Sequence, residues 1–162
     1  MISEFLYRRF SHPVNLCRSK NTDFTVKVGT SEKKPSYFIG TATQALFDGQ
    51  ALGAEIMIVD PPRKGLCEEV LNQLCKAHNN KQPYVEDPLS FSQPRHVINW
   101  TNDIHTLIYV SCGFDSLARD CDRLLSSNAG WKLDSAVGYV LFPGSDHIES
   151  VVIFKRRNAR AK

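Results

Sequence analysis

Residues 54–62 of the chain read Ala-Glu-Ile-Met-Ile-Val-Asp-Pro-Pro, an apolar run that ends at an acidic residue and two prolines. A continuous apolar run is typical of a strand buried on both faces of a parallel sheet. Proline cannot donate a ladder hydrogen bond, so the strand must end before Pro61. A second run, Thr-Leu-Ile-Tyr-Val at 106–110, ends in the same way at Ser111-Cys112-Gly113. The two runs predict two parallel strands of one sheet.

Helical spacing follows each of these predicted strands. After Gly65, apolar residues recur at the spacing of a first helix, at Leu66, Val70, Leu71 and Leu74, with acidic residues at 68–69 in its first turn. The second helix has one face marked by Leu117, Cys121, Leu124 and Leu125. Two further strands, expected at 131–142 and 149–154, form an antiparallel pair. The order strand, helix, strand, helix and strand pair predicts an α/β fold with a mostly parallel sheet.

The other segments have weaker patterns. Residues 1–22 have no clear period, and we expect an irregular leader there. Residues 37–47 fit a strand or a helix. The stretch 79–105 is rich in Asn, Pro, Asp, Ser and Gln, which predicts a long surface loop inserted in a domain at 23–156. Residues 157–162 are expected to form a basic tail.

Composition narrows the class of protein. With 162 residues, 42% hydrophobic and 23% charged, the chain is typical of one globular domain. No apolar run approaches the ~18 residues of a membrane span. A net charge of +3 permits an RNA partner without requiring one. Five cysteines without a Cys-x-x-Cys pair exclude the usual metal spacings and predict free thiols in a reducing, intracellular compartment, cytoplasmic or organellar.

Three polar groups lie where the predicted strands meet their loops. They are 60–65, with Asp60 and Arg63, then Ser111-Cys112-Gly113, and His147-Ile148-Glu149. Open α/β sheets bind ligands at the carboxyl ends of their strands, so we expect the three groups to face one cleft. Taken singly, each residue also fits a simpler role. Cys112 fits a small core residue, Asp60 a turn former, and Glu149 an exposed charge.

The same three groups resemble the motifs of RNA uracil-5-methyltransferases. Val-Asp-Pro-Pro-Arg-Lys-Gly-Leu at 59–66 is similar to the family's Asp-Pro-Pro-Arg-x-Gly signature. Tyr-Val-Ser-Cys at 109–112, followed by Leu-Ala-Arg-Asp at 117–120, resembles its nucleophile motif. Phe142-Pro143 with residues 147–150 looks like its C-terminal motif. The resemblance covers residues 55–156 and implies a Rossmann-like class I methyltransferase sheet that uses S-adenosylmethionine to methylate uridine in tRNA or rRNA.

The resemblance also implies a role for each site residue. Cys112 would add to C6 of the uracil ring, and Glu149 would remove the proton from C5. Asp60 would lie in the cofactor pocket. Support for the site or for RNA would come from Arg63, Phe114 and His147. The family mechanism uses no metal.

Two features depart from the family pattern. Gly113-Phe114 follows the nucleophile where bacterial members usually have Asn-Pro, and it offers Phe114 as a base-stacking face. The glycines are never spaced as Gly-x-Gly, so we expect the class I cofactor loop to be missing and the domain to be N-terminally truncated. The alternative function is a non-catalytic remnant or partner-binding fragment. Adenine methyltransferases are disfavoured, because Arg63 stands where they have an aromatic residue. RNA 5-methylcytosine methyltransferases are disfavoured, because no cysteine follows Pro61 or Pro62.

Overall fold

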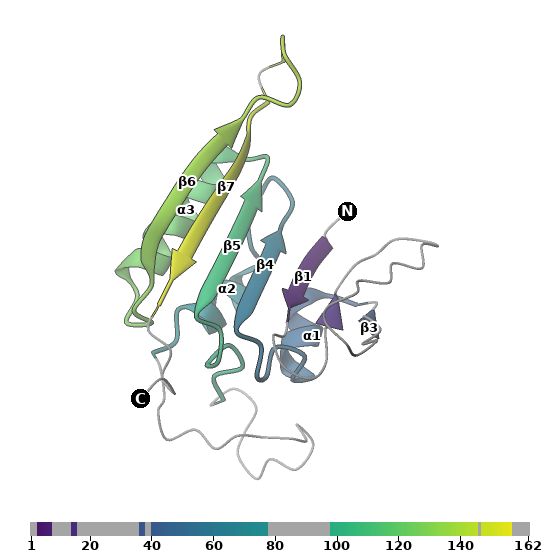
Figure 1. Cartoon of the computed structure of the whole chain (residues 1–162). Helices are drawn as coiled ribbons and strands as arrows, with labels where there is room; N and C mark the ends of the chain where they lie inside the picture. Colours follow the sequence, from purple (N-terminus) through teal and green to yellow (C-terminus); the bar gives the residue numbers. More distant parts are fainter. Residues whose placement is uncertain are drawn as a thin grey trace, which may run out of the picture.

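A five-stranded sheet is the main feature of the computed structural model (Figure 1). The structure describes residues 3–7, 14–15, 36–37, 40–77, 98–145 and 147–156. In spatial order the strands are β1 (Ser3–Tyr7), β4 (Ile56–Asp60), β5 (Thr106–Ser111), β7 (Glu149–Lys155) and β6 (Lys132–Tyr139). β4 and β5 are parallel, whereas β7 is antiparallel to both β5 and β6. The predicted parallel strands and the closing antiparallel pair are confirmed.

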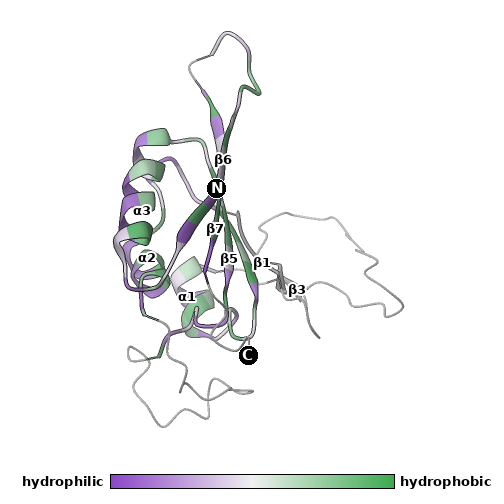
Figure 2. Cartoon of the chain, turned by 60° about the vertical axis from the view of Figure 1, so that its left-hand side comes forward, coloured by the Kyte–Doolittle hydropathy of each residue, from purple (hydrophilic) through white to green (hydrophobic). Residues whose placement is uncertain are grey.

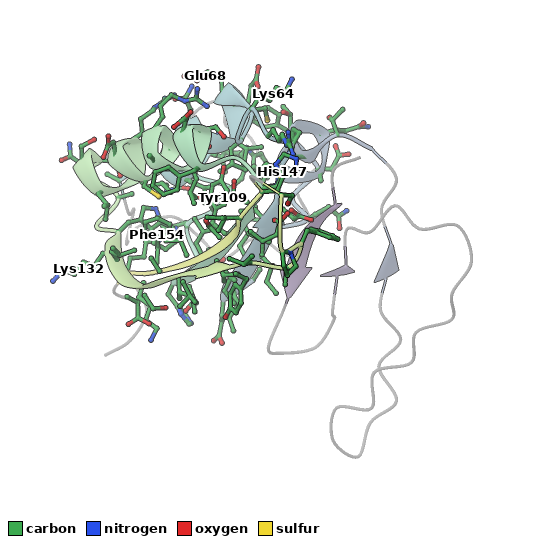
Figure 3. All side chains as sticks on the ribbon, turned by 90° about the horizontal axis from the view of Figure 1, so that it is seen from above. Lys64, Glu68, Tyr109, Lys132, His147 and Phe154 are labelled. Atoms are coloured by element: carbon green, nitrogen blue, oxygen red, sulfur yellow. The ribbon has the colours of Figure 1, made fainter. Side chains whose placement is uncertain are left out.

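Three helices pack on one face of this sheet, as Figure 2 shows. They are α1 (Ala42–Phe47), α2 (Glu68–Leu74) and α3 (Phe114–Ser126). Alternate strand residues point toward the helices and are buried; they include Met57, Val59, Leu107, Tyr109, Val152 and Phe154. In Figure 3, Tyr109 and Phe154 lie between the sheet and the helix layer. The α/β fold predicted from the sequence is therefore confirmed.

Residues 37–47, which fitted a strand or a helix, divide between the two. Ser36–Tyr37 forms the short strand β3, and α1 begins after Thr41. The Thr41 hydroxyl accepts a hydrogen bond from the Gln44 amide at 3.1 Å. This cap satisfies one of the amides that a helix start leaves without a partner, so it fixes where α1 begins.

The expectation of an irregular leader at 1–22 is wrong for two segments. Ser3–Tyr7 forms β1, which pairs antiparallel with β4 at the edge of the sheet. Val14–Asn15 forms β2, which pairs in parallel with β3. An edge strand joins a sheet through main-chain hydrogen bonds, and these leave no periodic pattern in the side chains. The rest of the leader and the tail at 157–162 lie outside the described residues.

The expected surface loop at 79–105 is wrong for its last part. Ile98, Trp100 and Ile104 belong to the hydrophobic core, and Trp100 is fully buried. Its ring meets Phe47 of α1 edge-on, with centroids 6.4 Å apart. The polar composition of the segment concealed these three apolar residues. Residues 78–97 lie outside the described part of the chain.

The end of β7 is anchored to this same segment. The Arg156 guanidinium lies over the Trp131 ring, 4.1 Å from its centroid. It donates hydrogen bonds to the carbonyl oxygens of Ile104 and Thr101. Burial disfavours the charged guanidinium and lowers the pKa of Arg156 to about 9, and the aromatic ring and the two carbonyls offset part of that cost. The anchor fixes β7, the strand whose other end carries Glu149.

Candidate active site

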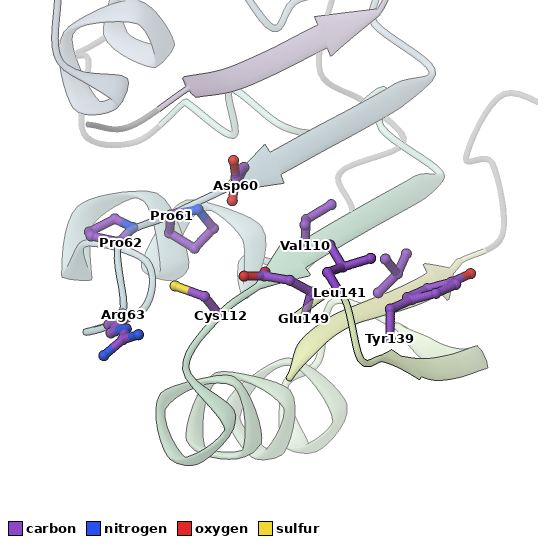
Figure 4. Close-up of a pocket in the computed structure, with 10 residues that line it drawn as sticks. Asp60, Pro61, Pro62, Arg63, Val110, Cys112, Tyr139, Leu141 and Glu149 are labelled. Carbon is purple, nitrogen blue, oxygen red and sulfur yellow. The ribbon is translucent and has the colours of Figure 1, made fainter. Parts of the chain in front are cut away.

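A cleft of about 630 Å³ opens at the carboxyl ends of β4 and β5 (Figure 4). Because the two strands are parallel, their carboxyl ends lie at the same edge of the sheet. Asp60 ends β4, and Cys112 follows the last residue of β5. The cleft is lined by Asp60, Pro61, Pro62, Arg63, Val110, Cys112, Tyr139, Leu141, Glu149 and Val151. The predicted convergence of the three motifs is therefore seen in the structure.

Strand register brings Glu149 to Cys112. β5 and β7 are antiparallel, and Ser111 is paired with Ser150. One further step along each strand places Cys112 across from Glu149. Ser111 and Ser150 are buried on the helix side. Because side chains alternate along a strand, Cys112 and Glu149 take the opposite face and both line the cleft.

Cys112 differs from the other described cysteines in its surroundings. Its thiol is half-buried and lines the cleft. Cys75 and Cys121 pack toward the core. Burial raises the pKa of Cys75, and burial together with the charge of Asp120 raises the pKa of Cys121 to about 11. Among the described cysteines, Cys112 alone lines the cleft.

Arg63 and His147 meet at the rim of the cleft. The Arg63 Nη2 atom lies 3.1 Å from both ring nitrogens of His147, and the histidine tautomer decides which of them accepts the hydrogen bond. Arg63 lines the cleft, whereas His147 contacts it through Arg63. Phe114 begins α3, is 74% exposed and is not a lining residue. Of the predicted site residues, Asp60, Arg63, Cys112 and Glu149 line the cleft, whereas Phe114 and His147 do not.

Two parts of the site were not predicted from the sequence. Tyr139 and Leu141, from β6 and the turn that follows it, form an apolar wall of the cleft. Asp120 is 1% exposed and accepts hydrogen bonds from the Tyr109 hydroxyl at 2.7 Å and the Leu66 amide at 2.9 Å. Burial, followed by the hydrogen bond to Asp120, raises the pKa of Tyr109. The Leu-Ala-Arg-Asp motif marked Asp120, but the sequence equally allowed a surface pair with Arg119.

The described residues show few other features that could indicate a function. None of their helices combines the length and the apolar character needed to cross a membrane. They also contain no group of three or more His, Cys, Asp or Glu side chains that could hold a metal ion.

Comparison with known proteins identifies relatives of one kind. The chain is 34% identical over 124 residues to an uncharacterised RNA methyltransferase of Protochlamydia amoebophila, which covers 76% of this chain and 25% of that protein. It is 35% identical over 98 residues to the tRNA (uracil(54)-C(5))-methyltransferase of Schizosaccharomyces pombe, covering 59% of this chain and 14% of that protein. The chain thus spans a quarter or less of these relatives. The resemblance that the motifs predicted is confirmed.

No family model matches the chain. Among solved structures, it is similar to the Pyrococcus abyssi tRNA (uracil-54, C5)-methyltransferase in complex with S-adenosyl-L-homocysteine. The TM-score is 0.47 at 22% identity, over 75% of this chain and 22% of that one.

Proposed function

We propose that this chain, whose relatives are RNA uracil-C5 methyltransferases, carries the catalytic cleft of such an enzyme. The reaction is the transfer of a methyl group from S-adenosylmethionine to C5 of a uridine in tRNA or rRNA. The observation that carries the proposal is the β5–β7 register, which brings Cys112 and Glu149 into one cleft beside Asp60. Addition to a ring and removal of its proton require a nucleophile and a base at one place.

Cys112 begins the reaction in this proposal. C5 of uracil is a weak nucleophile, and addition of the Cys112 thiolate to C6 makes it a stronger one. The sulfur forms a bond to C6, and the electron pair of the C5–C6 double bond moves to the ring as an enolate. C5 then carries enough electron density to take the methyl group from a sulfonium, whose sulfur keeps the electron pair of the broken bond and leaves as a thioether.

Glu149 completes the reaction. Once C5 is saturated, its remaining proton passes to the Glu149 carboxylate. The electron pair of that C–H bond re-forms the C5–C6 double bond, and the bond from C6 to the Cys112 sulfur breaks. Sulfur leaves as a thiolate, so Cys112 is regenerated and the ring is aromatic again.

The cleft fits the methyl donor in part. Asp60 lines it beside Cys112, and a carboxylate at that place would hold the cationic end of S-adenosylmethionine. When bound, the donor supplies an electrophilic methyl carbon. The nucleoside end has no matching loop in the described residues, because their glycines are never spaced as Gly-x-Gly. Asp60 is therefore the residue that we assign to the donor.

The outer side of the cleft suits RNA. Arg63 offers a charged guanidinium at the rim, where His147 fixes its direction. Phe114 exposes an aromatic face, and aromatic faces stack on unpaired bases. Tyr139 and Leu141 provide an apolar wall for a uracil that has left its stack. Taken together, the guanidinium, the exposed aromatic face and the apolar wall fit an RNA partner.

The test traps the covalent step. A chimera in which this chain replaces the matching segment of the Schizosaccharomyces pombe relative is incubated with S-adenosylmethionine and RNA that contains 5-fluorouridine. Fluorine replaces the proton that Glu149 removes, so release is blocked and a protein–RNA adduct accumulates. Cys112→Ala should abolish the adduct, and Cys121→Ala is the matched control that should retain it. An adduct in the Cys112→Ala protein would refute the proposed nucleophile.

A non-catalytic role is the second candidate, and the missing glycine-rich loop favours it. In that case the chimera should fold, as circular dichroism would show, and yet form no adduct in any variant. The described cysteines are free thiols, and under the first proposal this fits a reducing compartment, either cytoplasmic or organellar. Fractionation of cells that express the tagged chain would test this, and recovery from the secreted fraction would contradict it.

A further inference from the structure

The start of α3 holds the loop that leads from β4 to α2. The Ser116 hydroxyl donates a hydrogen bond to the Arg63 carbonyl oxygen. Arg119 Nη2 donates to the Lys64 carbonyl oxygen at 2.7 Å, and the Leu66 amide donates to Asp120 Oδ2 at 2.9 Å. These bonds join two segments that are far apart in the sequence. One of them carries Arg63, and the other directly follows Cys112.

Asp120 has the central place among these contacts. Its Oδ2 atom accepts from the Leu66 amide of the loop and from the Tyr109 hydroxyl of β5. The carboxylate is 1% exposed, and a buried carboxylate is stable only when its oxygens are well bonded. One oxygen atom therefore joins the loop, the helix α3 and the strand that ends next to Cys112. Asp120 is not itself a lining residue of the cleft.

Two glycines allow this close approach. A Cβ atom at Gly113 would lie 2.5 Å from the Arg63 carbonyl oxygen, which is main chain and cannot move alone. Gly65 has φ +89°, and a Cβ there would lie 2.6 Å from Asp120 Oδ2. Gly113 directly follows Cys112, so the contact lies next to the cleft cysteine. With a side chain there, the Arg63 loop would have to move away from the Cys112 turn.

We propose that Asp120 and Gly113 are positioning residues, which hold the loop of residues 60–66 at a fixed place against Cys112. Asp120 holds the loop by its hydrogen bonds, and Gly113 leaves the space into which the Arg63 main chain fits. The inference rests on the proposed function for its purpose, since the loop carries Asp60 and Arg63. It assigns both residues to a role away from the reacting atoms.

The test measures thiol reactivity in the full chain, without RNA or methyl donor. Reduced protein is treated with iodoacetamide, and peptide mapping gives a separate alkylation rate for each cysteine. The loop lines the same cleft as Cys112, so its release should raise the Cys112 rate. Cys75 packs toward the core and reports on loss of the fold. Cys121 also packs toward the core, but the charge of Asp120 raises its pKa, so its rate responds to any change of that charge.

Removal of the Asp120 carboxylate, which accepts the hydrogen bonds, should raise the alkylation rate of Cys112 selectively. In Asp120→Ala, the Cys112 rate should rise on the order of fivefold, as loss of a hydrogen bond predicts, while the Cys75 rate stays within about twofold of its original value. Asp120→Asn keeps an oxygen that can accept from Leu66 and Tyr109, so its Cys112 rate should stay within about twofold of the original chain. Both variants remove the charge that raises the pKa of Cys121, so Cys121 should react faster in both. An unchanged Cys112 rate in Asp120→Ala, or an equal rise at Cys112 and Cys75, would overturn the inference.

Gly113→Ala tests the same contact from the other side and serves if Asp120→Ala does not fold. It should raise the Cys112 rate selectively. Gly138→Ala is its control, because a Cβ there meets the end of the Ile148 side chain at 3.3 Å. Equal rates in the two glycine variants would also overturn the inference. Alkylation requires no methyl transfer, so a failed adduct test would leave this result standing, and the reverse also holds.

Discussion

Cys112 and Cys121 both follow β5, yet their thiols meet different surroundings. Cys112 lies where the strand ends and lines the cleft. Cys121 lies on α3 and packs against the core, where burial and the charge of Asp120 raise its pKa to about 11. Since the thiolate is the reactive form, Cys121 is protonated near neutral pH and is a poor nucleophile. The difference follows from position in the fold, because nothing in the residue type distinguishes the two.

The raised pKa values predict a loss of stability at alkaline pH. The fold favours the protonated forms of Cys121 and Tyr109, because it raises the pKa of both groups. That contribution is fully present below the unfolded thiol pKa of about 8.5 and is lost as pH rises through about 11. Burial also lowers the pKa of Arg156 to about 9, which acts in the opposite direction, because the unfolded arginine keeps its proton at that pH. From about pH 8 to about pH 11, the melting temperature, followed by circular dichroism in reductant, should therefore fall more in the original chain than in variants that lack the thiol or the phenol.

Two variants provide the control for the alkaline melt. Cys121→Ala and Tyr109→Phe each remove one of the titrating groups, so each should lessen the fall. Ser126 is an exposed residue of α3, and Ser126→Ala should leave the fall in melting temperature unchanged. A pH dependence of the melting temperature that is the same in both variants as in the original chain would contradict both shifts.

Glu149 gives a prediction that separates attachment from release. Replacement of the base by an amide leaves Cys112 free to add to C6 but removes the acceptor for the C5 proton. In the chimera, Glu149→Gln should lower methylation of ordinary uridine RNA roughly 100-fold, while a slowly forming adduct accumulates. Denaturing gels would show the adduct. Glu69→Gln, on the exposed side of α2, is the matched control, and equal methylation in the two variants would remove Glu149 from the mechanism.

At the scale of elements, the segment 98–104 illustrates how tertiary packing overrides composition. It has no helix or strand, yet it places Trp100 in the core against Phe47. The Trp100 amide donates a hydrogen bond to the side-chain oxygen of Gln73, and the Thr101 hydroxyl donates to the Gln73 carbonyl oxygen. The segment thus contacts α1 through the Trp100 ring and is bonded to α2 through the Trp100 amide and the Thr101 hydroxyl. It supports the helix layer beneath the site.

Truncation of Trp100 should measure that support. A fully buried aromatic ring replaced by alanine leaves a cavity, and such changes cost about 3–5 kcal/mol of unfolding free energy. Urea unfolding of Trp100→Ala should show a midpoint lowered to match. Leu133→Ala, at a side chain that is 52% exposed, should change the free energy by less than about 0.5 kcal/mol. Similar midpoints for the two variants would show that the segment is not part of the core.

The sequence predicted helices and strands well where burial produces a run or a period of apolar residues. It predicted them poorly where burial leaves no such pattern. β4 and β5 contain near-continuous apolar runs at 56–59 and 107–110, and the polar residues at the ends of these runs marked the cleft. β1 joins through its main chain, so its residues carried no signal. The sequence left open whether the Asp120 side chain is buried or exposed, because a motif does not show which way a side chain points. The wall formed by Tyr139 and Leu141 depends on where a hairpin folds back, which no local pattern reveals.

At the scale of the whole molecule, the described helices cover only one face of the sheet (Figure 2). The strand residues of the other face are apolar and only partly buried: Ile56, Ile58, Ile108, Val110, Val151 and Ile153. Parallel strands with such runs are usually covered on both faces. The cleft that holds Cys112 opens at the edge of this sheet. Its lining comes from strand ends and from the loops and hairpin beside them.

This arrangement predicts weak binding of the methyl donor. Asp60 offers a carboxylate to the cationic end of S-adenosylmethionine, but the described residues supply no glycine-rich loop for the nucleoside end. A micromolar dissociation constant corresponds to about 8 kcal/mol, which is more than one carboxylate and an open cleft should supply. Calorimetric titration of the chain should therefore give a dissociation constant weaker than about 100 µM. The chimera, which adds the relative's remaining segments, should bind at least tenfold more tightly, and Asp60→Ala should weaken its binding. Micromolar affinity of the chain alone would mean that the donor contacts residues other than those assigned to it.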